Sequence, residues 1–239
     1  QYSDPDYFRS RENKVVFTIP GLGTFSFSRT GYCLLNAVTL ALFVLTLTLY
    51  VVTGRIKLRK VFYNSLTILG CGVLIAAVAT GLAYAATRIS GVPFSFVSTK
   101  FLSWDWILTL VVIALTVCLY IWFFTSRVRR SESFVFEHVL GLLLLILAVS
   151  AVLLVTVGEN FFLLLPALCA IAALLLHMFV YMNVMSLPAL LSVVLTGASF
   201  LYNLYTALTV GSLGIIMFLV YLYAIMAASL VRCFMYQRR

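Results

Sequence analysis

Charged side chains are scarce in this sequence. Only 10% of its 239 residues are Asp, Glu, Lys or Arg, whereas 64% are hydrophobic. A soluble domain carries roughly 25% charged residues. The composition therefore excludes an ordinary soluble domain and predicts an integral membrane protein, with the lipid bilayer as its main partner.

Acidic residues and histidines are rarer still. The chain has seven Asp and Glu residues and two His residues, and they do not form a His-Glu-x-x-His run or a comparable ligand cluster. A zinc site needs three or four such ligands. We therefore expect no catalytic residue, no metal ligand and no cofactor in this chain.

The surplus of positive charge does not indicate a nucleic-acid-binding protein. The net charge is +9, with 16 Lys and Arg residues. Most of these cations lie in short segments between apolar stretches, which is typical of topology signals and of contacts with lipid headgroups. We expect no nucleic-acid partner.

Two short stretches near the start predict a β-hairpin. Residues 14–19 (KVVFTI) and 24–28 (TFSFS) are rich in aromatic and β-branched side chains, and the intervening Pro-Gly-Leu-Gly is typical of a tight turn. Residues 1–13 are polar and resemble a linker out of a soluble domain, so we expect a further domain before them.

Seven apolar stretches follow, each long enough to cross a hydrocarbon core of ~30 Å. They are residues 31–53, 61–87, 104–126, 134–157, 161–181, 186–208 and 211–231. The predicted fold is therefore an all-α integral membrane protein of about seven transmembrane helices, preceded by a short extramembrane β-hairpin. The domains are an outer linker and hairpin (1–30), a seven-helix membrane domain (31–231) and a basic cytoplasmic tail (232–239).

The basic residues predict the orientation. With the N-terminus outside and the C-terminus in the cytoplasm, ten of the sixteen basic residues lie inside. These are Arg55, Lys57, Arg59, Lys60, Arg127, Arg129, Arg130, Arg232, Arg238 and Arg239. The hairpin then lies on the periplasmic or lumenal side, and the absence of an Asn-x-Ser/Thr glycosylation site favours a bacterial inner membrane.

The second predicted span has small residues at helical spacing. Gly72, Ala76 and Thr80 are four residues apart, and so are the positions of a second series that contains Ala83. Small side chains let neighbouring helices approach closely. We expect this helix to pack on two sides.

Two groups of polar residues are candidate sites. Glu137, His138 and His177 lie at the predicted inner face, where they form either a metal or proton-relay site or simply an interfacial group. Arg88, Asp105 and Glu159 lie at the predicted outer face, as an exposed ion pair or as a dock for a preceding domain. Both interpretations stay open at this point.

Two stretches resemble a known family. VVFTIPGLGTFSFS, leading into the first span, and GENFFLLLPALCAIAALLL at residues 158–176 are similar to the membrane region of zinc metallopeptidases of the aminopeptidase-Y-like clan. That family includes the endoplasmic reticulum metallopeptidase, the fungal vacuolar membrane protease and bacterial relatives.

The resemblance implies a role for this chain within a larger enzyme. It implies an upstream soluble catalytic domain with two zinc ions and a glutamate base, none of whose positions exist in this sequence. The chain itself would then anchor and orient that domain, without hydrolytic activity of its own.

Two other classes of function are compatible with the pattern. One is a seven-helix receptor, although the sequence has neither an Asp-Arg-Tyr triplet after the third span nor a lysine in the last span. The other is a transporter or an accessory subunit of a membrane complex, against which the scarcity of buried charge and of glycine-broken helix pairs argues.

Overall fold

The computed structural model describes most of the chain. The described residues are 14–19, 23–91, 107, 110–111, 113–114, 117–118, 122, 133–156, 160–179, 187–210 and 214–235. Of the 23 residues of the third predicted span, 104–126, only eight isolated or paired positions are described, and Asp105 and Glu159 lie outside the described residues.

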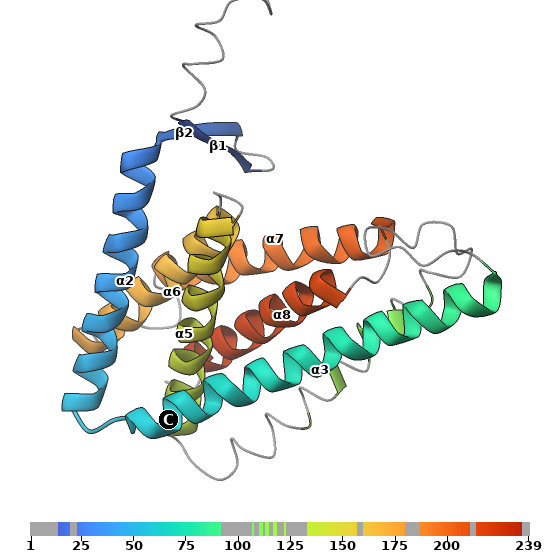
Figure 1. Ribbon diagram of the computed structural model, residues 1–239. Coiled ribbons are helices and arrows are strands. Elements are labelled where there is room, and N and C mark those ends of the chain that lie inside the picture. The colour runs from blue at the N-terminus through green and yellow to red at the C-terminus, as the bar shows by residue number, and fades with distance from the viewer. Residues whose placement is uncertain are drawn as a thin grey trace, which may run out of the picture.

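Two strands open the described part of the chain. Strand β1 (Lys14–Ile19) pairs antiparallel with β2 (Gly23–Ser28), with Phe17 opposite Phe25. β2 runs directly into helix α2, and the hairpin lies beyond one end of the helical body (Figure 1). Its extramembrane location stays a prediction.

The described residues include six helices. They are α2 (Arg29–Val52), α3 (Leu58–Ser90), α5 (Ser133–Thr156), α6 (Phe161–Phe179), α7 (Leu187–Val210) and α8 (Gly214–Met235). By length and composition, α2, α3 and α5 can each cross a membrane, whereas the apolar parts of the other three helices are shorter within the described residues. The structure is therefore consistent with a membrane protein with three candidate spans, and the number seven stays a prediction.

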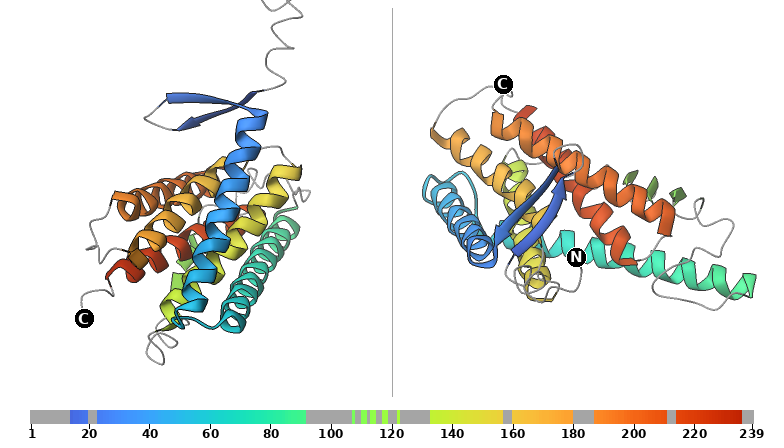
Figure 2. Two further views of the ribbon diagram at one scale, coloured as in Figure 1. Left: turned by 90° about the vertical axis from the view of Figure 1, so that its left-hand side faces the viewer. Right: turned by 90° about the horizontal axis from the view of Figure 1, so that it is seen from above.

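The helices cross one another rather than forming a set of parallel spans. α2 and α5 run in one direction, and α3, α7 and α8 run across them (Figure 1). Seen from above, α2 and α5 appear foreshortened, whereas α3, α7 and α8 show more of their length (Figure 2). At 33 residues, α3 is roughly 50 Å long, so it is long enough to span a bilayer while strongly tilted.

Helix α3 packs through one continuous stripe, not through the two sides that we predicted. Gly72 and Ala83 are buried in the same stripe as Ala79, and Ala76 and Thr80 lie half-buried at its margin. Seven residues make nearly two turns of 3.6 residues, so Ala79 lies almost directly above Gly72 and the two series share one face.

Two glycines allow close approach to this stripe. A Cβ on Gly72 would lie 2.5 Å from the ring of Phe218 on α8. A Cβ on Gly141 of α5 would lie 2.7 Å from the main-chain oxygen of Val61 and 3.1 Å from the amide nitrogen of Ser65. The contact at Gly141 is the stricter one, because main-chain atoms of a helix cannot move aside like a side chain.

We expect Gly141→Ala to destabilise the protein, because the added methyl group overlaps the α3 backbone. Overpacking of this kind costs about 1–3 kcal/mol. Gly70→Ala is the matched control: a Cβ there meets nothing within 4 Å, and alanine stabilises a helix by up to about 1 kcal/mol relative to glycine. Thermal unfolding in detergent measures both. Equal shifts for the two variants would contradict the close α3–α5 contact.

Candidate functional site

Asn160 begins helix α6 and joins it to two other helices. Its main-chain oxygen accepts hydrogen bonds from the amides of Leu163 (3.0 Å) and Leu164 (2.9 Å), as expected of the residue that caps a helix N-terminus. Its side chain is buried beside α2 and α5, where polar atoms need partners.

Every polar group of the Asn160 side chain has such a partner. The Oδ1 atom accepts a hydrogen bond from the hydroxyl of Tyr32, and the Tyr32 hydroxyl in turn accepts one from the main-chain N–H of Asn160 at 2.9 Å. The Nδ2 atom donates to Oδ1 of Asn36 at 2.7 Å and to Oγ and the main-chain oxygen of Ser150 at 2.7 and 3.0 Å. These four residues, Tyr32, Asn36, Ser150 and Asn160, are called the Asn160 network below.

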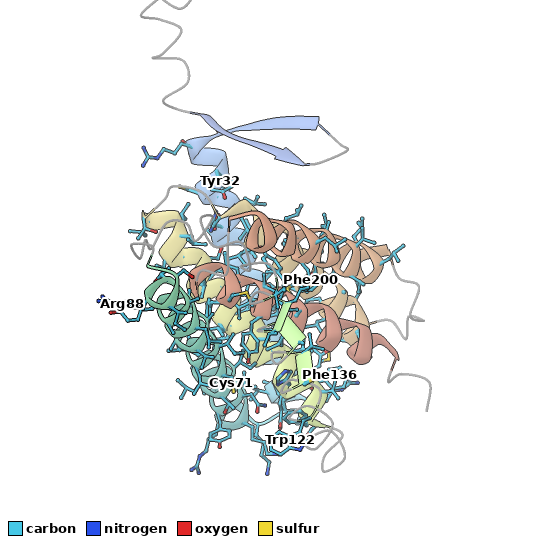
Figure 3. The ribbon with its side chains drawn as sticks, turned by 90° about the vertical axis from the view of Figure 1, so that its right-hand side faces the viewer. Tyr32, Cys71, Arg88, Trp122, Phe136 and Phe200 are labelled. Atoms are coloured by element: carbon cyan, nitrogen blue, oxygen red, sulfur yellow. The ribbon has the colours of Figure 1, made fainter. Side chains whose placement is uncertain are left out.

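The Asn160 network fixes the hairpin end of α2. Tyr32 lies in the first turn of α2, four residues after Ser28, where β2 ends. Tyr32 and Ser150 are each only 1% exposed, so water does not compete for these bonds. The network therefore ties the start of α2 to α5 and α6 directly below the hairpin, and Figure 3 shows Tyr32 at that end of the body.

We did not predict this network from the sequence. A signal was present: Tyr32 and Asn36 are one helical turn apart on an apolar span, and polar side chains within such spans require partners.

Glu137 is a residue of α5 that lies near the C-terminal end of α2, opposite the end held by the Asn160 network. Its carboxylate is buried, accepts a hydrogen bond from the Lys57 amide at 3.3 Å and lies 3.6 Å from Nζ of Lys60. Lys57 precedes α3 and makes no capping bond with its own side chain. Glu137 therefore supplies, from α5, the negative charge that a helix N-terminus favours.

The two histidines lie beside aromatic side chains. The His138 ring is buried beside Phe134, with 5.3 Å between ring centroids. The His177 ring lies 5.5 Å from Phe136, and its Nδ1 is 3.5 Å from the hydroxyl of Tyr50. Residues 136, 137 and 138 are successive positions of a helix, so they project about 100° apart and towards different neighbours.

No metal site emerges in the part of the chain that the structure describes. No group of three or more His, Cys, Asp and Glu side chains gathers there in a way that would hold a metal ion. The expected absence of a cofactor stays a prediction.

The predicted outer group is described only at Arg88. Its Nε atom donates a hydrogen bond to the hydroxyl of Tyr84 at 2.9 Å, and its guanidinium lies 5.2 Å from the centre of that ring. The partners proposed for it, Asp105 and Glu159, lie outside the described residues. Neither the ion pair nor the dock is tested.

Comparisons with known proteins do not place the chain in a family. No protein-family model, no curated protein and no solved structure matches it. The resemblance to zinc metallopeptidases therefore rests on the two sequence stretches alone.

We expect Asn160→Asp to lower the stability strongly. Aspartate keeps the shape of asparagine but replaces the Nδ2 donor with an oxygen, which faces the acceptors on Asn36 and Ser150. Unsatisfied buried polar groups cost about 1–3 kcal/mol each, so the loss should be on the order of 3 kcal/mol.

The matched control is Thr48→Val, which removes an exposed hydroxyl bonded only to the Val44 carbonyl of its own helix. A surface change of this kind stays within about 0.5 kcal/mol. Chemical denaturation in detergent compares the two variants, and a loss in Asn160→Asp no larger than the control would show that the network does not hold α2.

Proposed function

We propose that this chain is a membrane domain that anchors and orients a zinc metallopeptidase domain attached before the hairpin. The proposal combines the resemblance of the hairpin and of residues 158–176 with the three candidate membrane spans. The charge pattern supports an N-terminus in the periplasm or lumen, with a bacterial inner membrane as the favoured host.

The direct junction between β2 and α2 carries the proposal. β2 ends at Ser28 and α2 begins at Arg29, and Oγ of Ser28 accepts a hydrogen bond from the Gly31 amide at 3.1 Å. No residue separates the strand from the helix. The hairpin, to which the proposed domain would be attached, would therefore be held in a defined orientation, because the Asn160 network fixes α2 one turn further on.

We expect no ligand of the proposed zinc centre from this chain. Its Glu137, His138 and His177 lie towards the end of α2 that is opposite the hairpin, and they point towards separate neighbours. The zinc ions would be held wholly by the attached domain. The residues of this chain would hold the hairpin to which that domain is attached.

A tagged copy expressed from its own gene tests the proposal. We expect a tag after Arg239 to mark a polypeptide well above 26.6 kDa that stays in the membrane fraction after alkaline washing. Aminopeptidase activity should co-purify with it, disappear with a chelator and return with zinc. The isolated chain is the control and should carry less than one zinc per molecule and release no amine.

A receptor or transporter predicts another outcome. A tagged product close to 26.6 kDa, or a larger product without chelator-sensitive peptidase activity, would contradict the proposal. One tightly held zinc per isolated chain, lost in His138→Ala or His177→Ala, would contradict it as well.

A further inference from the structure

The turn between α2 and α3 has a defined backbone. After the last residues of α2, the amide of Gly54 bonds the Val51 oxygen at 3.0 Å and the amide of Arg55 bonds the Tyr50 oxygen at 3.1 Å. Gly54 has a φ of 70°. This is a Schellman motif, in which glycine adopts the left-handed conformation just after the helix.

Two contacts hold the rest of the turn against the protein. Ile56 is 4% exposed, so its side chain is anchored in the core. The next amide, that of Lys57, donates to the buried carboxylate of Glu137. With Ile56 directed inward, Arg55 and Lys57 on either side of it are exposed.

Four cations lie on this turn and in the first turn of α3. Arg55, Lys57, Arg59 and Lys60 lie within six residues and are all exposed. Within the described part of the chain, the ion pair at this turn joins Lys60 to Glu137. The other three cations, Arg55, Lys57 and Arg59, present their guanidinium and ammonium groups at the surface.

Large apolar side chains are exposed directly beside these cations. Val52 ends α2 and is 77% exposed, and Phe62 and Leu66 on α3 are 50% and 66% exposed. Phe62 and Leu66 are one helical turn apart and continue away from the cations along α3. Trp122, which is 72% exposed, lies at the same lower end of the body as the turn (Figures 1 and 3), and exposed tryptophan is typical of a membrane interface.

We propose that the α2–α3 turn binds the headgroup of an anionic glycerophospholipid. Arg55, Lys57 and Arg59 contact the phosphate and the remaining headgroup charge, and the acyl chains lie along Val52, Phe62 and Leu66. A soluble anion would match the cations but would leave the apolar side chains uncovered. A zwitterionic lipid would cover the apolar side chains without a net charge that matches the three cations. Only an anionic lipid satisfies both parts of the surface.

The inference requires that the turn lies at a membrane surface, but it does not depend on which side that is. It is also independent of the proposed peptidase, because it concerns residues of this chain alone.

Native mass spectrometry of the purified full chain in detergent tests the inference. Phosphatidylglycerol and phosphatidylcholine with the same acyl chains are added in competition, and the bound fraction of each is measured. We expect the wild-type chain to prefer phosphatidylglycerol. The triple variant Arg55→Gln, Lys57→Gln, Arg59→Gln should lose affinity for it by roughly a hundredfold, since each basic residue near an anionic surface contributes about fivefold.

Matched variants separate a site from general charge. Arg29→Gln with Arg88→Gln removes exposed cations at the far ends of α2 and α3 and should keep the preference. Arg55→Lys with Arg59→Lys keeps the charge on the turn and should keep it too. If the triple variant does not fold, the three single glutamine variants should each lose about fivefold.

Three results would overturn the inference. The first is an unchanged preference in the glutamine variants of the turn. The second is an equal loss in the Arg29 and Arg88 control, which would indicate attraction by net charge alone. The third is displacement of phosphatidylglycerol by inorganic phosphate at equal concentration, which would indicate a site for a free anion.

Discussion

A buried polar atom in an apolar body must find a partner, and in this protein the partners of Asn160 determine how the helices are joined. Asn160 binds Tyr32 and Asn36 of α2 and Ser150 of α5 while it begins α6. Lipid offers no hydrogen bonds, so breaking one of these contacts leaves a group unsatisfied rather than hydrated. The start of α2, and with it the hairpin, is held by this constraint.

Helix α5 provides the second half of the same arrangement. Ser150 contacts the Asn160 network near one end of α5, and Glu137 contacts the α2–α3 turn near the other. The two residues are 13 positions apart, which corresponds to roughly 20 Å along the helix. α5 thus makes one polar contact near each end of α2, through Asn160 at one end and the α2–α3 turn at the other. Between them, Gly141 allows α3 to pack closely against α5.

The local elements could be predicted from the sequence, and their arrangement could not. The apolar stretches 31–53 and 134–157 correspond closely to α2 and α5, because hydrophobicity and length alone identify such helices. No comparable pattern in the sequence predicts that α3, α7 and α8 cross α2 and α5. α5 is apolar on nearly every side, so its sequence does not show which face meets a neighbour.

The candidate sites show the same limit. Glu137 and His138 are adjacent in sequence and were predicted to belong to one group. Successive residues of a helix project in different directions, and these two contact Lys57 and Phe134 respectively. The Asn160 network joins residues up to 128 positions apart, and no spacing rule connects them.

The central claim, that the Asn160 network holds the hairpin in a fixed orientation, is tested most directly by one distance measurement. Spin labels at Ser26 in β2 and at the exposed Val155 of α5 report the hairpin relative to the membrane helices by pulsed electron spin resonance. The account predicts a narrow distance distribution in the wild-type background and a clearly broader one in Tyr32→Phe, which removes only the hydroxyl bonded to Asn160. Distributions of equal width would contradict it.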